Sequence, residues 1–261
     1  MGDRLGRYVL EERLGHGAMG TVYRAVREDG LVVALKVAAP ELAADETYRR
    51  RFEREGRIAA SLSHPHIVDV IEAGEAGGRP FLVSRLVHGR TLAQRIDEDG
   101  PLPDAQVVRI VSEIAAALDV LHERELVHRD VKPANIILEE VGGALLADFG
   151  LARGASDTVL TQTGRVSGTV DYLAPEVIRG AQAAPAADVY ALGCVAYACL
   201  SGAPPFATRS VPDAILAHLE SPPEPLPSPL SEAVLQALAK SPEERPPTAT
   251  TYALMLRVSL R

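Results

Sequence analysis

The sequence predicts an α+β protein of two lobes, in which a small antiparallel β lobe with one helix precedes a larger, mainly helical lobe. Short β-forming segments separated by glycine turns fill the first third of the chain, and amphipathic helical segments fill the rest. The pattern changes near Ser84–Gly89. We therefore expect one domain spanning residues 1–261, with an N-terminal lobe at 1–83, a hinge at 84–89 and a C-terminal lobe at 90–261.

The small lobe is predicted to be a meander interrupted by a single helix. Phe52, Ile58 and Leu62 recur at helical spacing, and the turn at Ser63–Pro65 ends that pattern. The elements expected here are strands at Tyr8–Leu14, Thr21–Val26 and Val32–Val37, a helix at Thr47–Leu62, and strands at Ile67–Ala73 and Phe81–Val83.

The large lobe is predicted to be built around a long helix at Asp104–Glu123. Asp104 suits the N-cap position, and an apolar stripe runs from Val107 to Leu121. A proline-rich loop is expected at Pro222–Pro229. Further helices are expected at Ala186–Ser201, Val211–Leu219, Ser231–Leu238 and Ala249–Leu260.

Composition narrows the class of protein. With 47% hydrophobic and 24% charged residues the chain is expected to fold, and a net charge of −8 disfavours nucleic acid as a partner. Cys194 and Cys199 have no metal-ligand spacing and are expected to be buried free thiols. We find no apolar run long enough for a membrane span and no signal peptide, so we expect a cytoplasmic protein, or the cytoplasmic domain of a longer, membrane-anchored one.

A glycine-rich segment, Gly15–Gly20, matches G-x-G-x-x-G, a pattern shared by dinucleotide-binding folds and by phosphate-covering hairpins. The residues that follow, Thr21–Val26, alternate and favour a strand, whereas a dinucleotide site needs a helix there. We therefore expect a hairpin whose backbone N–H groups cover phosphates.

A lysine, Lys36, stands within the apolar strand segment that begins at Val33. An ammonium in that setting needs a fixed anionic partner to offset its desolvation. Glu55, on the helix predicted at Thr47–Leu62, is the natural candidate, and the pair would aim the amine at the α- and β-phosphates of a nucleotide.

The most informative segment is His128–Asn135, which places a carboxylate, an amine and an amide on one short loop. Asp148 follows at the end of another apolar strand, Ala144–Ala147. Magnesium bound to a nucleotide prefers hard oxygen ligands, which Asn135 and Asp148 supply. Asp130 is then placed to accept the proton of an acceptor hydroxyl, and Lys132 to balance charge on the transferring phosphoryl group.

Five motifs in one order resemble the eukaryotic-type (Hanks-type) protein kinase family. They are the glycine loop, Val33–Lys36, His128–Asn135, Asp148–Gly150 and Ala174–Glu176, and together they cover almost the whole chain. Lys132 resembles the serine/threonine branch, and the Ala-, Arg- and Val-rich composition resembles actinobacterial members. The resemblance implies the bilobal protein kinase fold, transfer of the ATP γ-phosphate to protein Ser/Thr hydroxyls, and Mg²⁺ or Mn²⁺ as cofactor.

The resemblance also assigns site residues. It implies that Asp188 braces the catalytic loop and that Arg245 pairs with Glu176. Catalytic positions are Asp130, Lys132, Lys36 and Glu55, and metal ligands are Asn135 and Asp148. Nucleotide-binding positions are Leu14, Gly15, His16, Gly17, Ala18, Met19, Gly20, Thr21, Val22, Ala34, Lys36, Ser84, Arg85, Val87 and Ile137.

Within this nucleotide set, the resemblance places Val22, Ala34 and Ile137 around the adenine, with hydrogen bonds from the backbone of Arg85–Val87. Ser84 occupies the gatekeeper position, and its small side chain implies a deeper pocket behind the adenine. Arg85 departs from the family, where glutamate is common. His16 has no evident role.

Regulation is expected in the activation segment, Asp148–Glu176. Because Arg129 precedes the catalytic aspartate, we expect autophosphorylation at Thr161 and Thr163 to create an anion that pairs with Arg129, helped by a basic residue of the 47–62 helix. Thr169 is expected to form hydrogen bonds with Asp130 and Lys132. The expected partners are protein substrates and a second copy of the chain in trans; some family members also form homodimers through the small lobe.

Two alternatives share parts of this pattern. A pseudokinase that binds nucleotide as a scaffold usually lacks the lysine or one aspartate, yet Lys36, Asp130 and Asp148 are all present. A small-molecule phosphotransferase usually lacks the glycine triplet and the Ala-Pro-Glu motif, and both are present. An assay of phosphate transfer to protein, with a variant that lacks the Asp130 carboxylate as control, distinguishes the protein kinase from these two alternatives.

Overall fold

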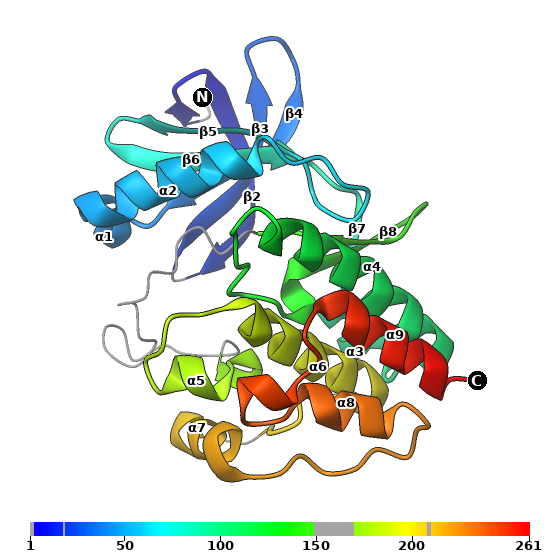
Figure 1. Ribbon diagram of the computed structural model, residues 1–261. Coiled ribbons are helices and arrows are strands. Elements are labelled where there is room, and N and C mark those ends of the chain that lie inside the picture. The colour runs from blue at the N-terminus through cyan, green and yellow to red at the C-terminus, as the bar shows by residue number, and fades with distance from the viewer. Residues whose placement is uncertain (1–2, 18, 149–169, 208–209) are drawn as a thin grey trace. The chain divides into compact units, whose positions relative to one another are not determined.

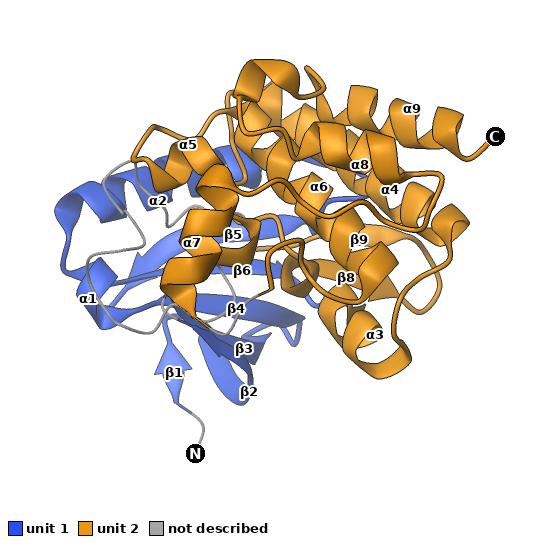
Figure 2. Cartoon of the chain, turned by 90° about the horizontal axis from the view of Figure 1, so that it is seen from below, with its two compact units in different colours: residues 1–88 blue, residues 89–261 orange. Residues whose placement is uncertain are grey.

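The computed structural model describes residues 3–17, 19–148, 170–207 and 210–261 (Figure 1). The chain divides into two compact units, Met1–His88 and Gly89–Arg261 (Figure 2). The first is a sheet with helices and the second is mainly helical, as the predicted α+β class requires.

Unit 1 is built on a six-stranded antiparallel sheet with the strand order β1-β2-β3-β4-β6-β5. The β2 strand runs three residues beyond the predicted end, because the glycine segment continues the pairing with β3 as far as Gly17 and Gly20. The predicted strand at Ile67–Ala73 begins later, since Ile67 and Val68 are buried but lie in a turn. The strands are β1 Arg4–Leu5, β2 Tyr8–Gly17, β3 Gly20–Arg27, β4 Val32–Ala38, β5 Val70–Ala76 and β6 Arg79–Arg85.

Two helices accompany this sheet, where one was predicted. The additional helix, α1, covers only Pro40–Ala43. The predicted helix is α2, Glu46–Ala59, which starts one residue early because Asp45 caps it by accepting from the N–H groups of Thr47 and Tyr48. It packs against β5 and β6 through its buried side.

The second unit combines helices with a small three-stranded sheet, in the order β7-β8-β9. The sequence did not predict β7 or α3, which have three and eight residues. The strands are β7 Gly89–Thr91, β8 Ile136–Glu139 and β9 Ala144–Leu146. The helices are α3 Leu92–Asp99, α4 Asp104–His122, α5 Pro175–Ile178, α6 Pro185–Ser201, α7 Val211–Glu220, α8 Ser231–Ala237 and α9 Ala249–Ser259, with short 3-10 turns η1 Pro133–Asn135, η2 Val170–Tyr172 and η3 Pro242–Glu244.

The core of unit 2 is centred on α6, which is buried from Ala187 to Cys199 and packs against α4, α8 and α9. The prediction that Asp104 caps α4 is wrong: Pro103 holds the N-cap position and makes no side-chain bond, and Asp104 is the first helical residue. There its carboxylate still favours the positive end of the helix dipole. Both cysteines are free and buried, as predicted.

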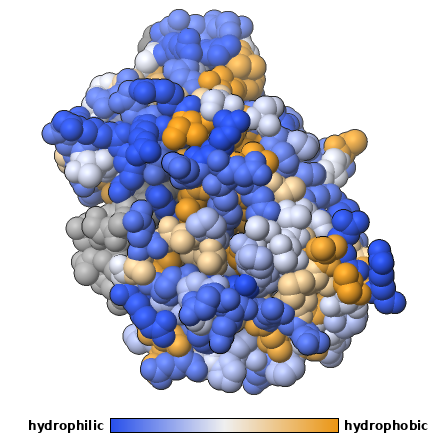
Figure 3. Space-filling model, viewed as in Figure 1, coloured by the Kyte–Doolittle hydropathy of each residue, from blue (hydrophilic) through white to orange (hydrophobic). Residues whose placement is uncertain are grey.

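Hydrophilic residues cover most of the face drawn in Figure 3, and apolar residues appear there in small groups. This agrees with the burial of the large apolar side chains inside the two units. None of the helices within the described ranges is long and apolar enough to cross a membrane.

Candidate active site

Three side chains meet on the loop between α4 and β8. The Asn135 side-chain amide donates to the Asp130 carboxylate at 2.9 Å and to the Asp130 backbone carbonyl at 2.8 Å. The Lys132 ammonium lies 2.9 Å from the same Asp130 carboxylate oxygen. The loop therefore brings together the carboxylate, amine and amide that the sequence predicted, and it fixes the direction in which Asp130 points.

A buried carboxylate on α6, Asp188, holds this loop from behind. One oxygen accepts from the backbone N–H of His128 at 2.8 Å, and the other accepts from the N–H of Arg129 at 2.9 Å. His122, at the end of α4, donates from Nε2 at 2.8 Å. With 1% of its surface exposed, Asp188 would be costly to bury without these donors. The brace implied by the family resemblance is therefore present, whereas no sequence pattern indicated the contact between His122 and Asp188.

His128 connects the loop to the residues that follow β9 and lead to Asp148. Its Nε2 lies 3.1 Å from the carbonyl oxygen of Ala147, so Nε2 carries the proton and donates. Its Nδ1 accepts a long hydrogen bond of 3.4 Å from the Asp130 N–H. Burial lowers the pKa of this imidazole below its ordinary value. His128 is thus a packed core histidine, and it joins the backbone beside two site residues.

Backbone strain is concentrated at the same place. Arg129 has φ 65° and Asp148 has φ 60°, both in the left-handed region that non-glycine residues seldom adopt. Such conformations persist where the surroundings over-determine them, and here Asp188 fixes the Arg129 N–H directly. Arg129 directly precedes Asp130, the predicted proton acceptor, and Asp148 is itself a predicted metal ligand.

The predicted metal ligands suit a hard divalent cation. Asn135 is 7% exposed, and because its amide nitrogen is committed to Asp130, its amide oxygen is the atom that can face a ligand. The Ala147 N–H donates to the Asn135 carbonyl oxygen at 2.9 Å, which brings the backbone before Asp148 beside Asn135. No group of three or more His, Cys, Asp or Glu in the described ranges could hold a metal by itself. A cation at Asn135 and Asp148 would therefore complete its shell with phosphate oxygens and water.

In unit 1, four of the residues predicted to contact nucleotide share one face of the sheet. Lys36 pairs directly with Val22 on β3, and Ala34 pairs with Ser84 on β6. Since side chains alternate along a strand, Val22, Ala34, Lys36 and Ser84 project from the same face. The other face carries the buried cluster that contains Leu35. Lys36 and Glu55 are both half-buried, and their pairing stays a prediction.

The glycine segment forms the predicted hairpin between β2 and β3, in which Gly17 pairs with Gly20. Gly20 has φ 141°, and a Cβ there would lie 2.0 Å from the Val37 carbonyl oxygen, so only glycine fits against β4. His16, which had no predicted role, contacts the Thr21 hydroxyl across the hairpin at 2.9 Å. Ala18 lies outside the described residues.

The remaining nucleotide positions are Leu14 and Met19 beside the hairpin, Arg85 and Val87 at the end of unit 1, and Ile137 on β8 of unit 2. The Arg85 N–H already donates to the Asp69 carbonyl oxygen at 3.0 Å, and the two side chains form an exposed ion pair. Thr161, Thr163 and Thr169, with residues 149–150, lie outside the described residues.

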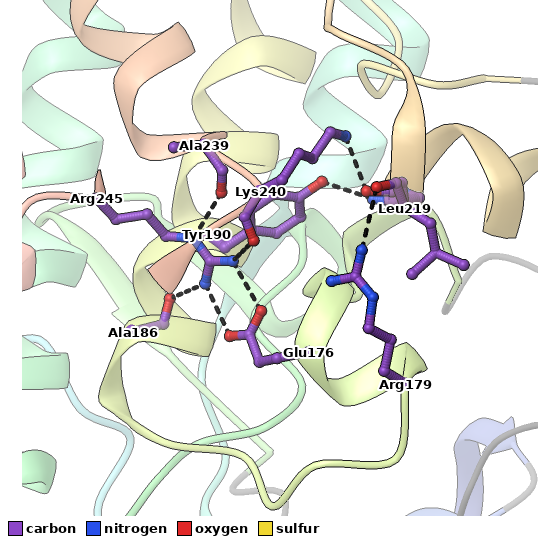
Figure 4. A network of polar contacts seen from close by, with 9 residues as sticks. Glu176, Arg179, Ala186, Tyr190, Leu219, Ala239, Lys240 and Arg245 are labelled. Atoms are coloured by element: carbon purple, nitrogen blue, oxygen red, sulfur yellow. Dashed lines mark hydrogen bonds and ion pairs between the residues drawn. The ribbon is translucent and has the colours of Figure 1, made fainter. Parts of the chain in front are cut away.

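Elsewhere in unit 2, Arg245, which follows η3, holds the start of α5 through Glu176. Its guanidinium makes a bidentate pair with Glu176, at 2.8 and 2.7 Å, as the resemblance implied (Figure 4). The same guanidinium donates to the carbonyl oxygens of Ala186, Ala239 and Lys240. The Arg245 side chain is fully buried, so its charge is balanced by one carboxylate and three carbonyl groups.

A buried histidine, His218 on α7, adjoins this network. The Tyr190 hydroxyl lies 2.8 Å from its Nδ1, and the Phe206 ring stacks edge-on against it at a centroid distance of 4.8 Å. Burial, aided by the charge of Lys240, lowers the pKa of His218 to about 4. The imidazole is therefore neutral in the folded protein at neutral pH.

Comparison with known proteins agrees with this geometry. The sequence model of the protein kinase domain family matches residues 8–253. The chain belongs to this family, and it is a kinase domain of the Hanks type that bacterial serine/threonine kinases carry. The two-unit α+β architecture is accordingly the bilobal kinase fold that was predicted.

Similar proteins are serine/threonine kinases of mycobacteria. The chain is 43% identical over 256 residues to serine/threonine-protein kinase PknD of Mycobacterium tuberculosis, covering 94% of this chain and 38% of that protein. It is 39% identical over 270 residues to PknH of Mycobacterium bovis, covering 100% of this chain and 45% of PknH. The crystal structure of the M. tuberculosis PknI kinase domain matches with a TM-score of 0.79 and 34% identity, covering 99% and 98% of the two chains. The chain thus spans about two fifths of the curated relatives' length.

Replacing Arg245 by Met should lower the free energy of unfolding by about 3–5 kcal/mol, because it leaves the Glu176 carboxylate and three carbonyl groups without their donor. Urea titration measures the change. Arg109→Met, which breaks an exposed i,i+4 pair with Glu113, is the matched control and should cost less than about 0.5 kcal/mol. The Glu176→Met/Arg245→Met double variant should lose less than the sum of the single variants. Strict additivity would contradict a direct coupling.

The stability of the chain should fall in mild acid because of His218. Its folded pKa of about 4 lies below the ordinary value of 6.5, so the unfolded state binds the proton more tightly. The stabilisation is complete above about pH 6.5 and is lost as the pH falls toward 4, by about 2 kcal/mol between about pH 6.5 and about pH 5. Urea titrations across this range should show a smaller decrease for His218→Phe, with a residual part from His128. Parallel decreases in both proteins would refute the assignment.

Proposed function

We propose that this chain is an ATP-dependent serine/threonine protein kinase that transfers the γ-phosphate to hydroxyl groups of proteins. The observation that carries the proposal is the loop on which Asp130 is oriented by Asn135 and Lys132 and is braced by Asp188. Phosphoryl transfer requires little covalent chemistry from a protein, so catalysis rests on positioning and on balancing charge. A preformed loop of this kind supplies both.

Asp130 accepts the proton of the acceptor hydroxyl as the hydroxyl oxygen attacks the γ-phosphorus. The bond between the γ-phosphorus and the oxygen that leaves with ADP breaks in the same transfer. Asn135 and Lys132 hold one carboxylate oxygen, so the carboxylate cannot rotate away from the incoming hydroxyl. The Lys132 ammonium also balances negative charge on the phosphoryl group during transfer.

The proposed contacts with ATP follow the family resemblance. The hairpin backbone covers the phosphates, Lys36 with Glu55 pairs with the α- and β-phosphates, and Val22, Ala34 and Ile137 contact the adenine. Mg²⁺ or Mn²⁺, held by Asn135 and Asp148, would neutralise phosphate charge and fix the phosphate geometry.

The acceptors are proteins, including a second copy of this chain. Phosphate on Thr161 and Thr163 would add about −1.5 to −2 charges each and pair with Arg129, whose backbone Asp188 already fixes. Exposed arginines of α2, such as Arg54, supply further positive charge. Trans-autophosphorylation requires two copies to meet, at least transiently. We place this activity in the cytoplasm, where ATP is available and where thiols such as those of Cys194 and Cys199 stay reduced.

Asp130→Asn should lower the rate of phosphotransfer by about 10²- to 10⁴-fold, since the amide cannot accept the hydroxyl proton. The assay incubates the chain with radiolabelled ATP and Mg²⁺ or Mn²⁺, with casein as acceptor. Asp97→Asn, an exposed carboxylate of α3, serves as the control and should retain wild-type activity. Labelling that survives in Asp130→Asn would exclude this mechanism.

Replacing Thr161 and Thr163 by Ala together should lower the activity of the purified chain, because Arg129 then gains no anionic partner. Mass spectrometry of the wild-type chain after incubation with ATP should find phosphate on one or both threonines. Thr158→Ala, in the same segment, is the control. A double variant with wild-type turnover, or a phosphate-free wild-type segment, would rule out this form of activation.

A further inference from the structure

The glycine hairpin of unit 1 includes an edge of the six-stranded sheet. Within the described residues, β1 pairs with β2 at Tyr8 and Val9, and beyond them β2 pairs with β3 alone. The register of this pairing shifts between Arg13 and Gly15, where a bulge interrupts the ladder. The end of β2, Gly15–Gly17, is therefore an edge segment that depends on its contacts with β3.

Two glycines leave this edge segment with little side-chain packing. A Cβ at Gly15 or Gly17 would meet no described atom within 4 Å, and neither residue has a positive φ. Unlike Gly20, these glycines are not required by the packing of the described chain. Their bare backbone suits close approach to a ligand, but glycine weakens a strand because it has more conformational freedom to lose and no side chain to pack.

His16 lies between these two glycines, and its side chain reaches across the hairpin. Its Nδ1 lies 2.9 Å from the Thr21 hydroxyl oxygen, and the two residues are direct partners in the ladder between β2 and β3. The hydroxyl group can donate to Nδ1 or accept from it, so the contact forms with either tautomer of the ring. Cross-strand pairs of this kind stabilise the pairing of two strands. The contact therefore holds the glycine segment on β3.

The His16 side chain projects from the face of the sheet opposite the predicted nucleotide residues. Thr21 pairs with His16 on β2 and with Val37 on β4, and directly paired residues project to the same face. Val37 belongs to the buried cluster on that face. Val22, the next residue along β3, projects to the nucleotide face because side chains alternate along a strand. The imidazole thus acts on the hairpin from the side away from the nucleotide.

Strand β3, the other partner in this contact, is paired on both sides. Its first residue, Gly20, already pairs with Ala38 of β4. Just before it, the Met19 carbonyl oxygen accepts from the Ala39 N–H at 3.1 Å. The end of β2, in contrast, is paired on one side. The contact with Thr21 therefore extends the order of β3 and β4 to the glycine segment.

We propose that His16 is a positioning residue for ATP: through Thr21 it keeps the glycine segment of β2 in the paired conformation that binds the phosphates. This inference rests on the proposed kinase activity. A ligand that binds one conformation has an apparent affinity that scales with the population of that conformation. Loss of the contact weakens ATP binding, whereas the transfer step at Asp130 keeps its rate once ATP is bound.

Calorimetric titration with Mg²⁺ and AMP-PNP, a non-hydrolysable ATP analogue, tests the proposal. The contact is exposed to water, so Thr21→Val, which keeps the side-chain shape without the hydroxyl, should raise the Kd about two- to fivefold. His16→Phe should raise it equally, and the double variant should lose no more than either single variant. Thr21→Ser, which restores the hydroxyl, should recover most of the affinity. Thr47→Val, at an exposed position of α2, is the control and should leave the Kd unchanged.

Two further readouts separate this role from a general loss of stability. In steady-state assays with casein, Thr21→Val and His16→Phe should raise the KM for ATP by the same factor as the Kd. Both kcat and the KM for casein should stay within about twofold of wild type. Hydrogen exchange of the nucleotide-free chain, followed by mass spectrometry, should be faster in peptides that cover residues 15–17 in both variants than in wild type.

The pattern across the variants decides between this role and a direct contact with the nucleotide. A raised Kd in His16→Phe with a wild-type Kd in Thr21→Val would show that the imidazole acts on the nucleotide itself, and it would overturn the proposal. An unchanged Kd in both variants would overturn the role of His16 alone, provided that wild type binds AMP-PNP and labels casein. A wild-type chain that binds no AMP-PNP would contradict the kinase proposal and this inference together.

Discussion

The burial of one carboxylate, that of Asp188, constrains most of the site. A charge with almost no exposure must find hydrogen-bond donors inside the protein, and Asp188 takes two of them from the backbone of His128 and Arg129. That requirement holds the loop in a strained conformation at Arg129, which directs Asp130 toward its partners. The buried helix α6 thus determines the direction of a side chain on the loop between α4 and β8.

A second set of contacts repeats this principle farther from the chemistry. Arg245 is buried against Glu176 and three carbonyl groups, and Lys240 caps α7 beside it. In both places a buried charge satisfies backbone groups of several elements that are distant in sequence. The loop that carries Asp130 and the segment that begins α5 are consequently held by separate networks.

The sequence predicted the α+β class, the long elements and the phosphate motifs because each depends on local spacing. The hairpin at Gly17 and Gly20 followed from the alternation of the next residues, and α6 followed from its apolar run. Prediction failed at Asp104, which is the first helical residue and not the N-cap, and at α1 and α3, which have only four and eight residues. Contacts such as that of His122 with Asp188 join residues that are far apart in the sequence, so no local pattern predicts them.

The proposed activity requires that the side-chain oxygens of Asn135 and Asp148 hold the metal ion of a bound ATP. A crystal structure of the chain with Mg²⁺ and a non-hydrolysable ATP analogue tests it most directly. The expected structure has Mg²⁺ at about 2.1 Å from side-chain oxygens of Asn135 and Asp148, and Lys36 in hydrogen-bond contact with the α- or β-phosphate. The hydrogen bonds from the loop backbone to Asp188 should be unchanged. A nucleotide bound elsewhere, or Mg²⁺ held without Asn135 and Asp148, would contradict it.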